Sequence, residues 1–281
     1  MVDEQNYYRE ITPSGFGIAI KIKEVLFSTQ SKYQKVEVLE SESSLGKILT
    51  LNDLMFLTEG DAYNYHEMIV HVPMLSHKNP KNVLIIGGGT GATAKEVLKH
   101  KSVEKLVVVD IDEVVVDTCK KYLPEIAGCL DDERVTVKIM DAFDYIKETD
   151  INFDVIIITS PDPLGPGVGE YTSEVYQNLK RLLNEDGIIV MQSESPVADT
   201  QKCKILYESL LKNFDVVEAY SSPIPTYPGG CWVWVFCSEN VKPLDNYDEK
   251  RYNDIIQNCK LFNKEYAEKR FEQETLLDDL L

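Results

Sequence analysis

A glycine-rich loop between an apolar strand and a helix constrains this chain more than any other feature. The apolar run Val83–Ile86 leads directly into the loop Gly87–Gly91, of sequence GGGTG, and a helix is expected from Ala92. Glycine lets the backbone turn tightly and approach a ligand at such a crossing. The loop and the helix after it lack the residues that hold a triphosphate, which favours a nucleoside without phosphates. A tight turn without a ligand is the alternative.

The pattern from Asn82 onward predicts a doubly wound domain, because continuous apolar strands alternate with helical stretches. Strands are expected at Val83–Ile86, Leu106–Val109, Val135–Ile139, Val155–Ile158, Ile188–Met191 and Trp232–Cys237. Helices are expected at Ala92–His100, Glu113–Tyr122, Ser173–Asn184 and Thr200–Asn213. This rhythm is typical of a parallel sheet that is covered on both faces.

The segment before this domain has a different pattern. From Ile18 to Glu59, short alternating stretches are separated by turns that contain serine and glycine, which predicts small antiparallel hairpins. We therefore expect an α/β protein with a small N-terminal β domain (residues 1–60), a Rossmann-like nucleoside-binding catalytic domain (61–245) and a C-terminal helical tail (246–281).

Composition excludes several classes of partner. The formal net charge of −18, with no basic stretch, argues against nucleic acid and favours a cationic small molecule. No apolar run approaches the roughly 20 residues of a membrane span, and the polar start of the chain does not resemble a signal peptide, so we expect a cytoplasmic protein. The six cysteines form no metal-ligand spacing, so no metal is expected.

Two carboxylates follow strands of the predicted sheet. Asp110 ends the second strand, 23 residues after Gly87, where an acidic side chain accepts hydrogen bonds from ribose hydroxyls. Asp141 follows the third strand and is placed either to accept from an adenine amino group or to cap the next helix, two interpretations of equal weight.

Five motifs resemble the spermidine synthases, in family order. They are Tyr65–Met68 (YHEM), the GGGTGA loop, Val109–Asp112 (VDID), Asp162–Pro166 (DPLGP) and Ile224–Gly230 (IPTYPGG). The likeness runs from about Tyr8 to Phe271. It implies a small β domain before a methyltransferase-type Rossmann domain, and assembly as a homodimer or homotetramer.

The resemblance also implies roles for particular residues. The nucleoside would be held by residues that include Gln34, Asp110, Asp141 and the glycines Gly87, Gly88 and Gly89. Tyr65, Asp162, Gln192 and Tyr227 would line the channel for the acceptor amine, where rings and a carboxylate flank a cation. The loop Leu164–Glu170 would cover the site and exclude water.

Two departures from the family pattern bear on the reaction. Thr90 stands in the glycine loop where the family carries an acidic residue for the ammonium of decarboxylated S-adenosylmethionine. Thr159 stands where the family carries the aspartate taken as general base. A threonine hydroxyl is hardly basic, so Asp162 is expected to take that role, with Tyr65 or His66 assisting. Because S-adenosylmethionine carries its own carboxylate, the change at Thr90 favours that cofactor.

Three hypotheses follow. The first is a transferase that uses S-adenosylmethionine to alkylate a small amine-containing molecule, most plausibly a methyltransferase, with Thr90 and Thr159 in its cofactor site. The second is a polyamine aminopropyltransferase that uses decarboxylated S-adenosylmethionine and putrescine. The third is a catalytically silent paralogue that binds a nucleoside or an active partner subunit.

Overall fold

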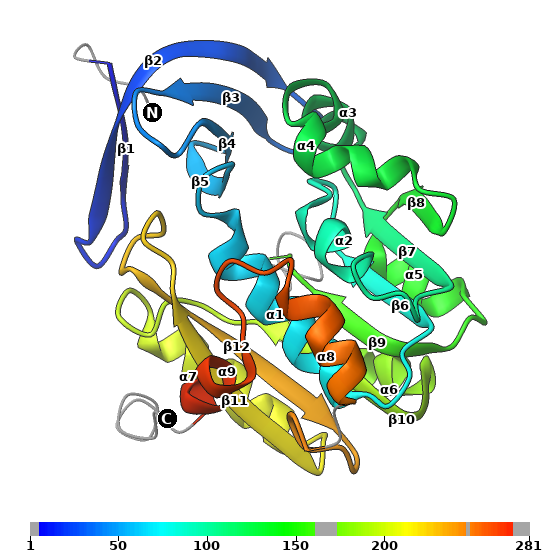
Figure 1. Cartoon of the computed structure of the whole chain (residues 1–281). Helices are drawn as coiled ribbons and strands as arrows, with labels where there is room; N and C mark the ends of the chain where they lie inside the picture. Colours follow the sequence, from blue (N-terminus) through cyan, green and yellow to red (C-terminus); the bar gives the residue numbers. More distant parts are fainter. Residues whose placement is uncertain (1–5, 161–172, 246–247, 272–281) are drawn as a thin grey trace.

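Two β-sheets connected by one long helix form the protein (Figure 1). The computed structural model describes residues 6–160, 173–245 and 248–271. In the N-terminal sheet each strand is antiparallel to the next. Its strands are β1 (Tyr7–Ile11), β2 (Gly17–Gln30), β3 (Lys35–Ser41), β4 (Lys47–Leu51) and β5 (Leu54–Thr58). Helix α1 (Ala62–Ser76) follows β5 and is buried along almost its whole length.

The second sheet has seven strands in the order β11-β12-β10-β9-β6-β7-β8. Its strands are β6 (Asn82–Ile86), β7 (Lys105–Asp110), β8 (Val135–Ile139), β9 (Phe153–Ile158), β10 (Leu183–Gln192), β11 (Val216–Pro223) and β12 (Cys231–Ser238). Strands β6 to β10 are parallel to their neighbours among themselves, whereas β12 is antiparallel to both β10 and β11. The reversal of strand order at β6 creates the crevice in which such sheets bind ligands.

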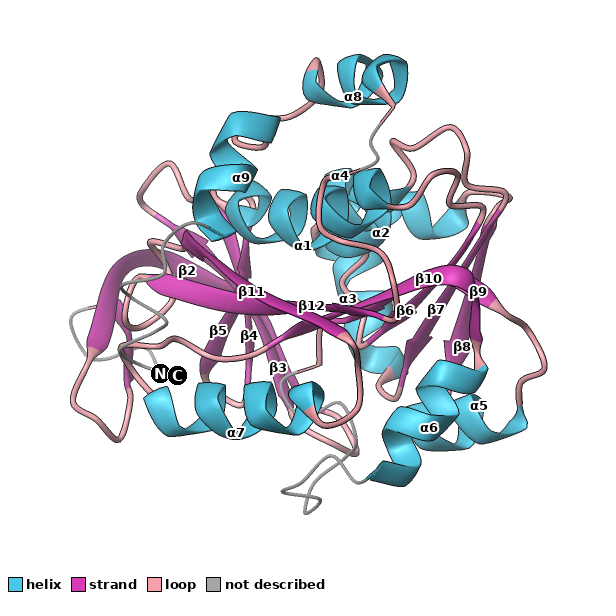
Figure 2. Ribbon diagram, turned by 90° about the horizontal axis from the view of Figure 1, so that it is seen from below, coloured by secondary structure: helices cyan, strands magenta, loops and turns pink. Residues whose placement is uncertain are grey.

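Helices cover both faces of this sheet (Figure 2). The helical elements after α1 are α2 (Ala92–Val97), α3 (Glu113–Tyr122), α4 (Pro124–Ala127), the 3₁₀ turn Gly128–Asp131, α5 (Ala142–Glu148), α6 (Ser173–Arg181), α7 (Thr200–Leu211), α8 (Glu249–Ile256) and α9 (Lys264–Phe271). Helices α5, α6 and α7 lie on one face, and α1, α2, α8 and α9 lie on the other.

The alternation of side chains along each strand divides the core between these faces. Val83 and Ile85 of β6 pack in the cluster that contains α1, α2 and α3, whereas Leu84 and Ile86 pack with α5, α6 and α7. All four side chains are almost fully buried. Such a strand reads as a continuous apolar run because both of its faces need burial.

The expected fold class is confirmed, with differences in detail. The sheet is mixed rather than parallel, because β12 returns antiparallel beside β10. Helix α1 and strand β11 were not expected, and α2 ends at Val97 rather than at His100. Helix α6 ends at Arg181, and β10 starts at Leu183 inside the helix expected over Ser173–Asn184.

Across the described ranges, none of the helices combines the length and the apolar character that crossing a bilayer requires.

Candidate functional site

The candidate site begins at the carboxyl ends of β6 and β9, which lie side by side in the sheet. Thr159 follows β9, and its backbone N–H donates to the carbonyl of Ile86 at 2.9 Å. Its hydroxyl donates to the carbonyls of Ile86 at 3.2 Å and Gly87 at 2.9 Å. The buried Thr159 side chain therefore holds the start of the glycine loop against the end of β9.

At two positions of the loop, neighbouring atoms of this chain leave no space for a side chain. Gly87 has a φ of +81°, and a Cβ there would lie 2.8 Å from the backbone nitrogen of Ser160. A Cβ on Gly89 would lie 2.6 Å from Oδ2 of Asp110. The Gly89 N–H donates to that oxygen at 2.7 Å. The loop thus fits closely around the carboxylate at the end of β7.

Asp110 is held by backbone donors on both oxygens, since the N–H of Asp112 donates to its Oδ1 at 3.0 Å. Burial raises the pKa of Asp110, although these N–H groups act in the opposite direction. Gln34 reaches the same region from the N-terminal sheet, and its amide donates to Oδ2 of Asp112 at 3.0 Å. The hydroxyl of Ser31 donates to the same oxygen at 2.7 Å. Asp112 therefore joins the two sheets beside the loop.

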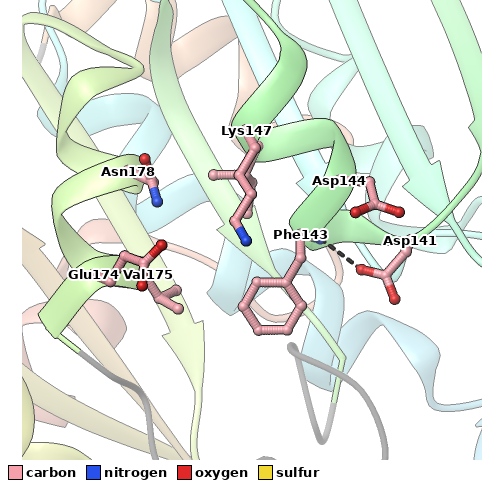
Figure 3. Close-up of a pocket in the computed structure, with 8 residues that line it drawn as sticks. Asp141, Phe143, Asp144, Lys147, Glu174, Val175 and Asn178 are labelled. Atoms are coloured by element: carbon pink, nitrogen blue, oxygen red, sulfur yellow. Dashed lines mark hydrogen bonds between the residues drawn. The ribbon is translucent and has the colours of Figure 1, made fainter.

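Asp141 lies at the start of α5, where the structure confirms the helix cap, whereas the contact with adenine stays a prediction. Its Oδ1 accepts from the N–H of Phe143 at 2.7 Å and so caps the helix. The same residue lines a cavity of about 420 Å³ (Figure 3). The other lining residues come from α5 and α6 and are Phe143, Asp144, Ile146, Lys147, Glu174, Val175 and Asn178. The cap and the cavity lining are compatible.

Aromatic side chains gather near the end of β10. Tyr65 of α1 donates from its phenol to Oε1 of Gln192 at 2.7 Å. The ring of Tyr227, in the turn after β11, lies 6.2 Å from that of Tyr65 between centroids, at 52°. The Tyr227 phenol donates to the carbonyl of Phe56 at 2.8 Å. The structure therefore brings together three of the four residues expected around an acceptor amine. The fourth, Asp162, lies outside the described residues, as does the segment Leu164–Glu170.

His66, next to Tyr65, and Thr90, in the glycine loop, are also buried. His66 Nδ1 lies 3.0 Å from the hydroxyl of Thr93, and burial lowers the pKa of His66 to about 4. A group with that pKa is a weak base toward an alkylammonium, so the lowered pKa argues against His66 as the proton acceptor. The hydroxyl of Thr90 accepts from the N–H of Ala92 at 3.3 Å at the start of α2.

Four polar residues, Asp112, Asp61, Thr58 and Thr226, were not predicted as site residues. Asp112 contacts Gln34, as described, and Asp61 accepts hydrogen bonds from the hydroxyls of Thr58 and Thr226 at 2.6 Å each. The run Asp112-Glu113 before a helix is a capping signal in the sequence, but nothing in the sequence indicates its partners. Within the described ranges, no group of three or more His, Cys, Asp or Glu residues is arranged to hold a metal ion.

Comparison with known proteins gives a consistent set of relatives. Residues 62–269 match the family model of the spermine/spermidine synthase domain, and residues 6–59 match that of the spermidine synthase tetramerisation domain. A polyamine aminopropyltransferase of Clostridium botulinum is 39% identical over 98% of this chain and 97% of its own length. One of Methanocaldococcus jannaschii is 38% identical over 89% of this chain and 85% of its own length.

Solved structures agree with these relatives. A spermidine synthase in complex with the transition-state analogue AdoDATO superimposes with a TM-score of 0.93 at 34% identity, and the match covers 100% of this chain and 96% of that one. The spermidine synthase of Thermotoga maritima gives a TM-score of 0.88 at 33% identity, covering 99% and 96%.

These relatives correct one expectation. Methyl transfer from S-adenosylmethionine was expected because Thr90 and Thr159 replace acidic residues. It is wrong, because the curated relatives are named polyamine aminopropyltransferases. The match covers 97% and 85% of their own lengths. The two threonines are weaker evidence about the reaction than a family match that extends over residues 6–59 and 62–269.

Proposed function

Since the chain belongs to the spermine/spermidine synthase family, we propose that it transfers an aminopropyl group from decarboxylated S-adenosylmethionine to a primary amine such as putrescine. At the coarser level it is a transferase. The observation that carries the proposal is the group formed by Tyr65, Gln192 and Tyr227 at the same edge of the sheet as the glycine loop. Paired tyrosine rings suit a cation, because their faces carry negative potential.

The nucleoside half of the donor would lie against the carboxyl ends of β6, β7 and β8. Asp110 is placed to accept from ribose hydroxyls, and the backbone of Gly87 to Gly89 would line the sulfonium side of the donor. Asp141 would accept from the adenine amino group with the oxygen that its helix cap leaves available. Gln34, fixed by Asp112, would approach the nucleoside from the N-terminal sheet.

The reaction needs an uncharged amine in line with the sulfonium. The amine lone pair forms a bond to the propyl carbon, the bond between that carbon and sulfur breaks, and sulfur leaves with the electron pair as a thioether nucleoside. One proton must leave the nitrogen, and Asp162 is our proposed acceptor for it. Burial raises the pKa of Tyr65 well above its usual value, so its phenol stays protonated and serves to hold Gln192 rather than to take the proton.

Thr90 and Thr159 would give this site less negative charge than its relatives have. The Thr159 hydroxyl donates to two backbone carbonyls and offers the donor no charge. We therefore expect the terminal ammonium of the donor to be bound weakly at Thr90, with the overall charge of −18 attracting both cationic substrates at longer range.

Assembly into a homodimer or homotetramer is part of the proposal. The N-terminal sheet lies within the residues that match the tetramerisation domain. It exposes large apolar side chains, among them Ile11 at 73%, Leu54 at 56% and Val25 at 48%. Because these residues lie in the part that matches a tetramerisation domain, they are the first candidates for a contact with another chain. Light scattering on the purified protein would measure the size of the assembly.

The decisive experiment mixes the purified protein with decarboxylated S-adenosylmethionine and putrescine. We expect spermidine and 5′-methylthioadenosine to form in equal amounts, as separated by liquid chromatography. S-adenosylmethionine in place of the donor is the matched control and should give no aminopropyl product. Binding of the nucleoside without any product would indicate a silent paralogue and would refute the proposal.

A further inference from the structure

Asp61 lies at the N-cap of α1 but does not cap that helix with its side chain. Its Oδ1 accepts from the hydroxyl of Thr58 at 2.6 Å, and its Oδ2 accepts from the hydroxyl of Thr226 at 2.6 Å. All three side chains are buried. Thr226 lies 165 residues away, in the turn after β11. The carboxylate therefore joins the end of β5, the start of α1 and that turn.

Other aspartates at helix starts behave differently. Asp112, Asp141, Asp199 and Asp248 all accept with their side chains from N–H groups in the first turn of their own helices. That is the usual use of an N-cap aspartate, because the first N–H groups of a helix lack partners. Asp61 instead directs both oxygens to hydroxyls, and hydrogen bonds to a buried carboxylate are among the stronger ones in proteins.

Asp61 and Thr226 each lie close in sequence to one ring of the aromatic pair of the candidate site. Tyr65 lies one helical turn after Asp61 on α1, and Tyr227 directly follows Thr226. The N–H of Tyr227 donates to the carbonyl of Ile224 at 3.0 Å, which makes the turn tight. A shift of Thr226 relative to Asp61 therefore moves one ring against the other.

A small cavity connects the same residues. It has a volume of about 10 Å³, and its lining includes Asp61, Tyr65, His66, Ile224 and Tyr227. A space of that size holds no more than about one water molecule. Both oxygens of Asp61 already accept from hydroxyls, so Asp61 acts through these partners and not through a direct contact with the amine.

We propose that Asp61 is a positioning residue for acceptor binding, which fixes the ring of Tyr227 against that of Tyr65 through the hydroxyl of Thr226. The inference rests on the proposed aminopropyl transfer. The proposed role concerns the amine and not the nucleoside donor, because the contact lies at the aromatic end of the site and not at the glycine loop. Loss of the contact should therefore weaken binding of the amine while leaving the nucleoside end intact.

The test compares Thr226→Val, which removes the hydroxyl at nearly constant volume, with Thr226→Ser, which restores it. We expect Thr226→Val to raise the KM for putrescine about tenfold and Thr226→Ser to return it to within about twofold of the wild type. The KM for decarboxylated S-adenosylmethionine should stay within about twofold in both. Asp248→Ala is the matched control, because it removes an N-cap aspartate on α8 without touching the site.

Calorimetry with putrescine in the presence of 5′-methylthioadenosine gives a second readout that needs no turnover. If the protein binds putrescine but forms no spermidine, the proposed function is refuted. The binding measurement still tests the role of Asp61 in that case. We expect Asp61→Ala and Thr226→Val to weaken this binding to the same extent, and the double variant no further. Unchanged binding in Thr226→Val, additive losses, a parallel loss of nucleoside binding, or no putrescine binding by the wild type would each overturn the inference.

Discussion

The phenol of Tyr65 donates a 2.7 Å hydrogen bond to Oε1 of Gln192, and so joins α1 to the last residue of β10. Both side chains are buried, with exposed fractions of 4% and 8%. The bond fixes the orientation of the Gln192 amide. It also fixes the plane of the Tyr65 ring, which lies 5.3 Å from the indole of Trp234.

The first prediction removes this bond. Tyr65→Phe leaves the carbonyl oxygen of Gln192 buried without its donor, which should cost about 1–3 kcal/mol of unfolding free energy. Because the amide is then no longer held, kcat/KM for the amine should fall by about tenfold or more. Urea unfolding and initial rates measure the two effects. Tyr63→Phe, two residues earlier on α1, is the control and should change neither. Equal losses in both variants would contradict the assigned role.

The fold was predictable where periodicity is simple. The strands β6 and β9 are apolar on both faces, so their sequences read as short apolar runs next to glycine or turn residues. Helix α1 was missed because it is buried all round, which removes the polar stripe that marks an amphipathic helix. Strand β11 was missed because it mixes exposed Glu218 with buried neighbours over few residues.

The site was predictable only in part. Gly87, Gly89 and Asp110 follow strand ends in a known order, so their proximity could be inferred from local sequence. The contact between Asp61 and Thr226 spans 165 residues, and its pairing depends on where the turn after β11 arrives. No local pattern encodes such a contact, because threonine in a turn has many available partners.

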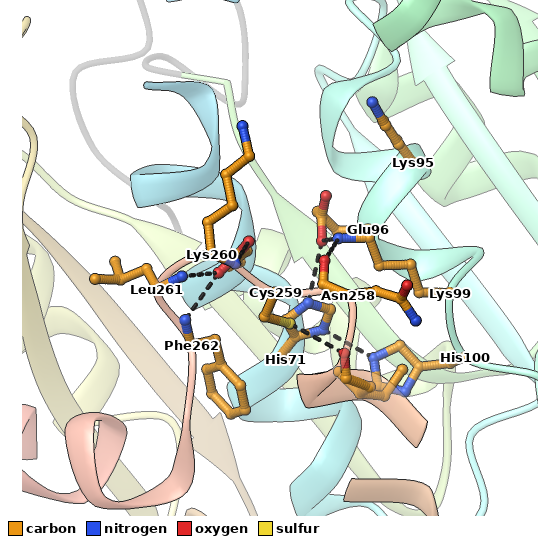
Figure 4. A network of polar contacts seen from close by, with 12 residues as sticks. His71, Lys95, Glu96, Lys99, His100, Asn258, Cys259, Lys260, Leu261 and Phe262 are labelled. Atoms are coloured by element: carbon orange, nitrogen blue, oxygen red, sulfur yellow. Dashed lines mark hydrogen bonds and ion pairs between the residues drawn. The ribbon is translucent and has the colours of Figure 1, made fainter. Parts of the chain in front are cut away.

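The second prediction concerns Glu67, which anchors the C-terminal region to α1. Its two carboxylate oxygens accept from the backbone N–H groups of Lys260, Leu261 and Phe262, each at 2.8 Å (Figure 4). Glu67→Gln replaces one accepting oxygen with a donor that faces N–H groups. The free energy of unfolding should fall by at least about 2 kcal/mol, and the segment after Cys259 should become sensitive to protease.

The control for this variant is Glu265→Gln, on the exposed surface of α9. Its carboxylate pairs with Lys269 at 2.6 Å, but the side chain is 77% exposed. An exposed pair contributes little, so the change in unfolding free energy should stay below about 0.5 kcal/mol. If Glu67→Gln were as mild as this control, the three N–H bonds would not hold the segment.

The third prediction is acid sensitivity from buried histidines. Burial lowers the pKa of His66 to about 4, against an ordinary value of 6.5, and also lowers that of His100. Between pH 4 and pH 6.5, the unfolded chain therefore binds a proton at His66 that the folded chain does not bind. Stability is therefore complete above pH 6.5 and declines as the pH falls toward 4. His66 alone should remove about 2 kcal/mol between pH 8 and pH 5.

Urea unfolding at a series of pH values, at fixed protein concentration, measures this loss. His66→Gln keeps a polar group near Thr93 but cannot titrate, so its stability should vary less with pH than that of the wild type. The slope that remains belongs to the other groups with shifted pKa values, among them His77 and His100, whose pKa values are also lowered by burial. A variant whose pH dependence matches the wild type would show that His66 is not the titrating group.

The last prediction concerns donor choice at Thr90, which is buried at the start of α2 with 4% exposure. Its hydroxyl accepts from the N–H of Ala92. In Thr90→Asp a carboxylate can accept that bond equally well and adds a negative charge beside the glycine loop. That charge would attract the terminal ammonium of decarboxylated S-adenosylmethionine and repel the carboxylate of S-adenosylmethionine.

We therefore expect Thr90→Asp to bind the decarboxylated donor about tenfold more tightly, or by ~1.4 kcal/mol, and to bind S-adenosylmethionine less tightly than the wild type. Calorimetry with both nucleosides measures the two affinities side by side. Thr90→Asn is the matched control, because it has nearly the same shape without the charge. If Asn and Asp changed the two affinities alike, shape rather than charge at this position would determine the choice of donor.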